Sequence, residues 1–373
     1  MNHTPGPALE GPETPAVVVD LEVLRRNVRR MADAAASAGL ALRPHAKTHK
    51  IPEIGRLQVE AGAAGLTVAT VGEAEVFAEH GIEVLFIAYP LWVTERMARR
   101  LLDLAGRVRL SFGVDSAEGA AHAARRLAAA SGGAGGALPE VLVEVDSGHH
   151  RSGVAPGHAL AVAEAARAGG LEVAGVFTFP GHSYGPGAAA GAAHSEHEAL
   201  TEAASLLEEA GFEVRRRSGG STPSALLTEP GGATEIRPGV YVFGDAQQLE
   251  LGRCAAEDVA LTVWSTVVSR HESPEGPRRT VLDAGSKVLG GDRPGWASGY
   301  GRLADHPEAR IEALSEHHAT VVWPEDRELP PLGSRLRVIP NHVCLVPNLV
   351  DEVLVDDGAS LRAWRVAARG RNS

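Results

Sequence analysis

Between residue 20 and about residue 250, short apolar segments alternate with amphipathic segments rich in Ala, Glu and Arg. This alternation is typical of βαβ units that build a parallel sheet. Eight strand-like segments occur, and eight βα units in about 230 residues match the size of a (β/α)8 barrel. The predicted strands lie at 40–43, 66–70, 84–88, 109–115, 141–146, 173–179, 213–217 and 241–243. We therefore predict an α/β fold with a TIM-type barrel; a doubly wound open sheet is the weaker alternative.

The first helix of this pattern is expected directly after Asp20, whose side chain can cap the helix N-terminus. Apolar residues then recur on one face at helical spacing, and this face should pack on the sheet. The residues on this face are Leu21, Leu24, Val28, Met31 and Ala35.

After about residue 255 the pattern changes to period-two stretches broken by Gly, Pro and Asp, for example 259–269, 280–282 and 335–339. This change predicts a mainly antiparallel β domain over 251–373, following a barrel domain over 20–250. A further strand at 16–19 belongs either to the barrel or to the second domain, so the assignment of residues 1–19 is open.

Composition limits the classes of ligand. The net charge of -11 argues against nucleic acid or an anionic membrane as partner, since both need an accumulated positive field. No apolar run approaches the ~20 residues that span a bilayer, and residues 1–13 do not have the pattern of a signal peptide. Two cysteines cannot form a disulfide framework and indicate a reducing compartment. We expect a cytoplasmic protein that binds a small molecule.

Lys47 follows a short apolar segment, and four other basic residues surround it in sequence: Arg43, His45, His49 and Lys50. Burial and neighbouring cations depress the pKa of a lysine and make its amine a nucleophile. The pattern favours a reactive lysine once the rest of the chain is considered; by itself it also fits a basic loop facing water.

The segment Ser-Gly-Gly-Ser-Thr-Pro at 218–223 follows the seventh predicted strand, where barrels typically bind phosphate. Gly220, Ser221 and Thr222 could cradle a phosphate through backbone N–H groups and hydroxyls. A Gly/Ser turn without a ligand is the alternative.

Other polar residues are expected at the same rim of the barrel. Arg151 could bind a phenolate or carboxylate oxygen. His182 and Tyr184 offer an imidazole and a phenol after the next strand, and the Tyr241 hydroxyl could reach a phosphate. The alternatives are that Arg151 is a surface arginine, that His182 and Tyr184 belong to a structural turn, and that Tyr241 is a core tyrosine.

His342 and Cys344 lie two residues apart in a stretch that we predict to be a strand, where they would share a face and could bind one metal ion. Imidazole and thiolate together favour zinc, and two protein ligands leave positions open for catalysis. A buried cysteine near a histidine is the alternative. Glu316, His317 and His318 precede this pair, and their role is undecided.

Taken in order, these segments resemble the family of D-serine dehydratases and D-threonine aldolases, pyridoxal-phosphate enzymes of the alanine-racemase-like fold. The resemblance covers nearly the whole chain. Its carriers are Pro-His-Ala-Lys-Thr-His-Lys at 44–50, Glu-Val-Asp-Ser-Gly-His-His-Arg-Ser-Gly at 144–153, Gly-His-Ser-Tyr at 181–184, Ser-Gly-Gly-Ser-Thr-Pro at 218–223 and Pro-Asn-His-Val-Cys at 340–344.

The resemblance implies roles for these residues. Lys47 is similar to the Schiff-base lysine, and Arg151 to the partner of the cofactor's phenolic oxygen. The phosphate cradle is implied for Gly220, Ser221 and Thr222, with Tyr241 reaching the same phosphate.

His342 and Cys344 resemble the zinc pair of the dehydratases, whereas the aldolases usually carry Asp at the second position; this favours dehydration. The family often has Ser-Glu-Glu-His-Gly where this chain has Ser-Glu-His-His-Ala at 315–319, a departure that bears on the geometry beside the metal and on the substrate.

The implied reaction is dehydration of a D-amino acid with a β-hydroxyl group, D-serine giving pyruvate and ammonia, with Lys47 as base at Cα and zinc at the hydroxyl. The alternative is a D-threonine aldolase that uses Mn²⁺ or Mg²⁺ and His182 as base, and yields glycine and an aldehyde. A pyridoxal-phosphate carrier without turnover is a third reading, which the β domain disfavours. The resemblance also implies a homodimer.

Overall fold

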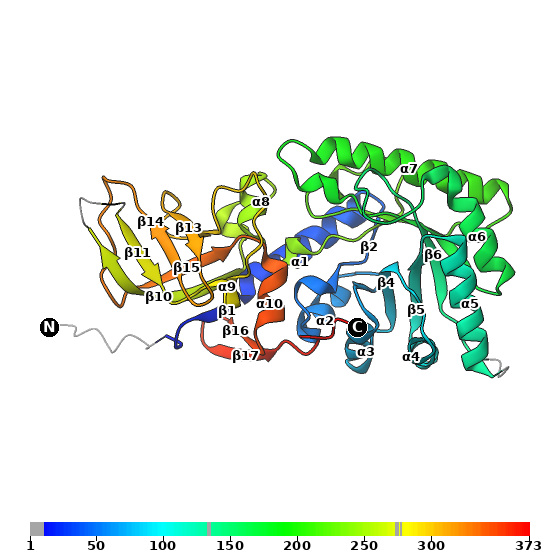
Figure 1. Ribbon diagram of the computed structural model, residues 1–373, viewed down its shortest axis with the longest axis horizontal. Helices are drawn as coiled ribbons and strands as arrows, with labels where there is room; N and C mark the ends of the chain where they lie inside the picture. The colour runs from blue at the N-terminus through cyan, green and yellow to red at the C-terminus, as the bar shows by residue number, and fades with distance from the viewer. Residues whose placement is uncertain (1–10, 133–135, 273–275, 277) are drawn as a thin grey trace.

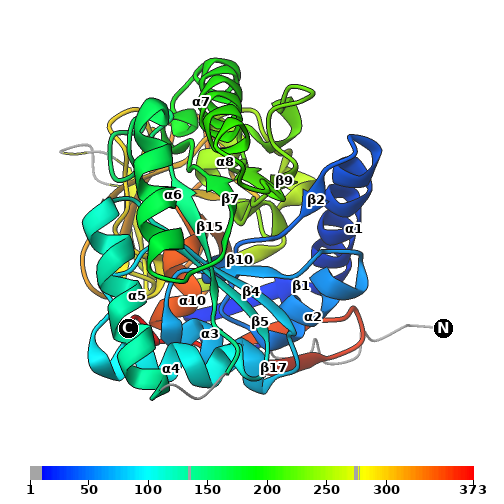
Figure 2. The same ribbon diagram turned by 90° about the vertical axis from the view of Figure 1, so that its right-hand side faces the viewer.

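The computed structural model describes residues 11–132, 136–272, 276 and 278–373. Two parts lie side by side in Figure 1: an antiparallel sheet on the left, and a parallel sheet surrounded by helices on the right. The view in Figure 2 shows helices around the outside of the parallel strands.

The parallel sheet has eight strands in the order β2-β9-β8-β7-β6-β5-β4-β3. A parallel bridge between His45 and Thr67 joins the chain just after β2 to β3, and Thr67 N–H donates to Pro44 O at 2.8 Å, so the ends of the sheet meet. This closure confirms the predicted barrel, and the open-sheet alternative is wrong. The strands are β2 Ala41–Leu42, β3 Leu66–Val68, β4 Val84–Pro90, β5 Arg109–Val114, β6 Glu140–Glu144, β7 Val173–Phe177, β8 Arg216–Gly219 and β9 Glu235–Ile236.

Seven of these strands overlap predicted segments, but the segment predicted at 241–243 is wrong. Residues Val240–Val242 form a 3-10 helix, η5, and the eighth strand is β9, earlier in the chain. β9 is two residues long and begins with a glutamate, so it has no apolar pattern to reveal it. The apolar residues of η5 are buried as a helical turn.

The barrel helices are α1 Leu21–Ser37, α2 Pro52–Glu60, α3 Val71–Glu79, α4 Glu95–Ala105, α5 Ala117–Ser131, α6 Ala159–Ala168, α7 Ala189–Glu209 and α8 Ala246–Glu250. The prediction for α1 is confirmed: the Asp20 side chain accepts from Val23 N–H at 2.9 Å, and the apolar face predicted for this helix is buried. Among the described residues, no helix is both long enough and apolar enough to cross a bilayer.

The second sheet has nine strands, with a path β13-β14-β11-β10-β1-β16-β17 and with β15 pairing with β10 and β12. Its strands are β1 Ala16–Asp20, β10 Leu261–His271, β11 Arg279–Leu282, β12 Gly301–Leu303, β13 Arg310–Leu314, β14 Ala319–Val322, β15 Arg335–Pro340, β16 Glu352–Asp356 and β17 Leu361–Arg365. Two short helices, α9 Ser286–Leu289 and α10 Val346–Leu349, connect strands of this sheet. Since β1 pairs with β10 and β16, we propose that residues 16–20 belong to the second domain with 251–373.

A buried ion pair joins β9 to the start of the barrel. Arg43 Nε lies 2.7 Å from Glu235 Oε2, and their side chains are 6% and 2% exposed. Ser218 Oγ donates to the other carboxylate oxygen of Glu235 at 2.7 Å. Burial alone would raise the pKa of Glu235, but Arg43 and Arg216 outweigh it and hold this pKa below its usual value. The barrel therefore encloses a charged group that is fully paired.

Replacing Glu235 with Ala should destabilise the fold by about 3–5 kcal/mol, because the Arg43 charge would stay buried without its partner. Urea unfolding measures this loss. The control is Asp351→Ala, which breaks an ion pair with Arg369 whose side chains are 87% and 44% exposed and should cost less than about 1 kcal/mol. Equal losses for the two variants would contradict the prediction.

Candidate active site

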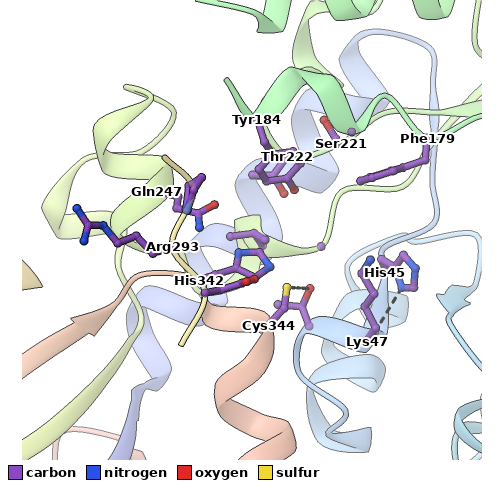
Figure 3. Close-up of a pocket in the computed structure, with 16 residues that line it drawn as sticks. His45, Lys47, Phe179, Tyr184, Ser221, Thr222, Gln247, Arg293, His342 and Cys344 are labelled. Carbon is purple, nitrogen blue, oxygen red and sulfur yellow. Dashed lines mark hydrogen bonds between the residues drawn. The ribbon is translucent and has the colours of Figure 1, made fainter. Parts of the chain in front are cut away.

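A cavity of about 360 Å³ opens between the barrel and the β domain (Figure 3). Its wall is built from the barrel loops, from α8 and from the segment after β15. Six of the site residues predicted from the sequence line it: Lys47, Tyr184, Ser221, Thr222, His342 and Cys344. A second cavity, of about 540 Å³, shares part of its wall with the first. The shared residues are His45, Lys47 and Phe179, so Lys47 stands between the two spaces.

Lys47 lies in a 3-10 turn, η1 Ala46–Thr48, directly after β2. The imidazole of His45 caps this turn, with Nδ1 accepting from Lys47 N–H at 3.4 Å, and Figure 3 shows the two side chains next to each other. Lys47 Nζ lies 5.5 Å from the centre of the Phe179 ring. Within the described part of the chain, Nζ has neither a hydrogen bond nor an ion pair.

The environment of Lys47 lowers the pKa of its amine, chiefly through burial and also through Arg151 and Arg237, while Cys344 and Glu73 oppose the shift. A lowered pKa leaves more of the amine unprotonated near neutral pH, which a nucleophile or base requires.

The basic residues next to Lys47 in the sequence do not all act on the pKa of Lys47 as predicted. Two of them are neutralised by buried carboxylates: Arg43 pairs with Glu235, and Lys50 Nζ lies 3.0 Å from Glu73 Oε1. The cations that act on Lys47 instead come from distant loops of the barrel.

The loop after β8 brings Ser221 and Thr222 to the cavity wall. Ser221 Oγ is hydrogen-bonded to Ser183 Oγ at 2.7 Å and to Ser224 Oγ at 2.8 Å, which holds its hydroxyl in place. Gly220 has a φ of +77° and turns the chain there. Its N–H donates to Glu196 at 2.7 Å, so this N–H is not free for a phosphate.

The two predicted tyrosines differ. Tyr184, at the end of η3 Gly181–Tyr184, lines the first cavity beside Thr222, and burial is the main cause that raises its pKa. Tyr241 lines neither of the two cavities, and its hydroxyl accepts from Gln58 Nε2 at 3.0 Å. The structure does not bring the Tyr241 hydroxyl to the cavity, because η5 turns this side chain toward α2.

Arg151 lines the second cavity, with its guanidinium carbon 5.0 Å from the centre of the Phe179 ring. His182 lines neither cavity; its ring lies over Gly148, and burial lowers its pKa.

Arg237 and Gln247 are among the side chains at the site that were missing from the predicted set. Arg237 lines the second cavity, is buried, and has Nε without a hydrogen-bond partner among the described residues. Gln247, from α8, lines the first cavity and is shown near His342 in Figure 3. The Arg-Pro-Gly segment at 237–239 was a visible signal for the arginine; nothing in the sequence singles out the glutamine.

His342 and Cys344 lie next to each other at the cavity wall (Figure 3). The prediction that both lie on one strand is wrong: β15 ends at Pro340, and Cys344 lies in a 3-10 turn, η7 Val343–Leu345. The turn nevertheless directs both side chains to one place. Burial alone would raise the pKa of the Cys344 thiol, but His342 and Lys47 outweigh it and bring it below its usual value, which favours the thiolate that binds metals.

Thr48 Oγ1 lies 3.2 Å from Cys344 Sγ, so η1, which carries Lys47, contacts the imidazole–thiol pair directly. No cluster of three or more His, Cys, Asp or Glu residues suited to a metal ion occurs in the part of the chain that the structure describes. Because the pair supplies two donors, an ion bound there would take its remaining ligands from water or substrate. Glu316, His317 and His318 are exposed on the turn between β13 and β14, outside both cavities.

Comparison with known proteins identifies relatives of both parts. Residues 19–247 match the alanine racemase N-terminal domain, and residues 260–355 match a putative serine dehydratase domain. The chain is 36% identical to D-threo-3-hydroxyaspartate dehydratase of Delftia sp. (89% of this chain, 91% of the relative). It is 33% identical to D-threonine aldolase of Arthrobacter sp. (98% and 95%). The solved Delftia dehydratase superposes with a TM-score of 0.84 at 33% identity, covering 95% of this chain and 97% of that one.

A racemase-like barrel, a second β domain and a cavity with a lysine beside an imidazole–thiol pair define an alanine-racemase-like lyase that depends on pyridoxal phosphate. Within that class, the chain belongs to the family of D-serine dehydratases and D-threonine aldolases.

Proposed function

We propose that this protein eliminates water from a D-amino acid that carries a β-hydroxyl group, with pyridoxal phosphate at Lys47 and zinc at His342 and Cys344. Hydrolysis of the dehydrated product returns one water and releases ammonia, so that the net products are a keto acid and ammonia. The observation that carries the proposal is that the lysine and the imidazole–thiol pair line one cavity. D-Serine, which would give pyruvate and ammonia, is the substrate that we propose first.

The residues present fit the cofactor. Ser221 and Thr222 place hydroxyls at the cavity wall for a phosphate. Arg151, and Arg237 with its Nε free of a hydrogen bond among the described residues, offer cations for the phenolic oxygen and the ring nitrogen of the cofactor. When bound, pyridoxal phosphate supplies the electron sink that acidifies the substrate Cα proton.

Lys47 is the residue that removes this proton. Its amine lies at the junction of both cavities, and its lowered pKa makes it a usable base near neutral pH. Phe179 forms part of both walls, and its ring centre lies 5.5 Å from Lys47 Nζ.

The donor set of the second pair fits zinc, because an imidazole and a thiolate are borderline-soft ligands. His342 and Cys344 would hold the ion, which supplies Lewis acidity that helps the β-hydroxyl leave. A relative supports this assignment. A D-threo-3-hydroxyaspartate dehydratase variant in which alanine replaces a cysteine was solved in a metal-free form. Another D-threo-3-hydroxyaspartate dehydratase variant replaces a histidine numbered two positions earlier, which is the spacing of His342 and Cys344.

Product analysis tests the reaction and the substrate together. The purified, cofactor-loaded protein is incubated with D-serine, D-threonine or D-threo-3-hydroxyaspartate, each with and without a chelator. We expect a keto acid and ammonia, and loss of both when the chelator removes the metal. The Delftia relative makes D-threo-3-hydroxyaspartate the necessary second substrate in this test.

Glycine and an aldehyde as products would instead identify a D-threonine aldolase, for which Mn²⁺ or Mg²⁺ would be the metal. No product from any substrate, with the cofactor bound, would support a carrier without turnover.

We further propose a cytoplasmic homodimer. Both cysteines are free thiols in the structure, as expected for a reducing compartment. Light scattering during size exclusion measures the mass, and a value near 38.9 kDa would mean a monomer.

A further inference from the structure

Asp245 is a fully buried carboxylate directly behind the imidazole–thiol pair. Its side chain is 0% exposed, and it precedes α8. One oxygen, Oδ1, accepts from Gln248 N–H at 2.8 Å and caps the helix. The other oxygen, Oδ2, accepts from Val343 N–H at 3.1 Å, at the start of η7.

The same oxygen faces His342. Asp245 Oδ2 lies 3.4 Å from His342 Nδ1, and this buried nitrogen makes no hydrogen bond with the described residues. A histidine ligand commonly donates its second ring N–H to a carboxylate, which fixes the tautomer and the orientation of the ring. With Nδ1 directed at Asp245, Nε2 is the nitrogen that remains for the cavity.

Further contacts link Asp245 to the cavity wall. Gln247, two residues on, lines the cavity, and its N–H donates to Asn341 O at 3.2 Å. The start of α8 is thereby attached both to the residue before His342 and to the residue after it. The Asp245 carboxylate thus lies where α8 contacts the segment that carries His342 and η7.

We propose that Asp245 is a positioning residue, which holds His342 with Nδ1–H toward the carboxylate and Nε2 toward the metal. The inference rests on the proposed metal site and goes beyond it, because Asp245 lines neither cavity and would act through His342. The competing explanation is that Asp245 only caps α8.

The variant Asp245→Ser separates the two explanations. Serine is a good N-cap residue and can still accept from Gln248 N–H, but it is too short to replace Oδ2 beside His342. The matched control is Asp258→Ser: Asp258 also accepts from a backbone N–H, that of Ala255, at 3.1 Å, and lines neither of the two cavities. Zinc dissociation constants are measured on the cofactor-loaded protein by competition with a chromophoric chelator, and the visible spectrum is recorded after cobalt substitution.

We expect Asp245→Ser to weaken zinc binding about 10–100-fold and to change the cobalt spectrum, with the control unchanged in both. Wild-type zinc affinity and spectrum in Asp245→Ser would overturn the inference and leave only the cap. If Asp245→Ser does not fold, Asp245→Asn replaces it. Asparagine keeps one uncharged oxygen, so Asp245→Asn should weaken zinc binding less than Asp245→Ser would. An unchanged zinc affinity and cobalt spectrum in Asp245→Asn would again overturn the inference.

A wild-type protein that binds no zinc, or binds it equally well after Cys344→Ala, would show that the proposed metal site itself is wrong. That result would reject the inference together with its premise, and it is distinguishable because it does not involve Asp245.

Discussion

Replacing Lys47 with Ala should remove the visible absorption of bound pyridoxal phosphate and lower the rate at least about a thousandfold. The variant loses both the nucleophile that binds the cofactor and the base at Cα. Lys47→Arg should fail equally, because a guanidinium keeps the charge but stays protonated. Absorption spectra and turnover with D-serine measure the two effects.

The composition of the chain makes a direct test possible. It contains three lysines, Lys47, Lys50 and Lys287. Borohydride reduction of the loaded protein, digestion and mass spectrometry should find the cofactor on Lys47. Lys287 is the control, since its side chain is 60% exposed and pairs with Glu316 on the surface. A cofactor attached to Lys50 or Lys287, or normal absorption in Lys47→Ala, would refute the assignment.

Replacing Cys344 with Ala should abolish zinc binding and reduce dehydration at least about a hundredfold, while pyridoxal phosphate stays bound. One of only two protein donors is lost, and with it the Lewis acidity at the β-hydroxyl. Metal analysis, absorption spectra and turnover distinguish the three properties.

The other cysteine supplies the matched control. Cys254 lines neither of the two cavities, and burial is the main cause that raises the pKa of its thiol to about 12. Cys254→Ala should leave zinc content and turnover unchanged. Dehydration at the wild-type rate in a zinc-free Cys344→Ala protein would mean that the metal is not on the reaction path.

Several features of the fold and site were predictable because they depend on short segments. Apolar periodicity predicts α1, and Asp20 before it supplies the cap that the structure shows. The Ser221–Thr222 loop and the His342–Cys344 spacing are likewise local, and both reach the cavity. The position of the imidazole–thiol pair at the cavity did not depend on the predicted strand, since a 3-10 turn directs the same two side chains to one place.

The features that the sequence does not reveal depend on contacts between distant segments. The strand β9 exists where Glu235 pairs with Arg43, 192 positions earlier in the chain. Tyr184 and Tyr241 were both predicted at the site, but only Tyr184 lines the cavity. The Tyr241 hydroxyl instead accepts a hydrogen bond from Gln58, 183 positions away in the chain.

By itself, then, the sequence determined the barrel, the second β domain and the chemical groups available at the site, since periodicity and short motifs are properties of neighbouring residues. Tertiary structure alone decided the positions, partners and pKa values of those groups. Arg151 and Arg237 help to lower the pKa of Lys47, and Asp245 lies behind His342, because folding brings together charges that no local pattern connects.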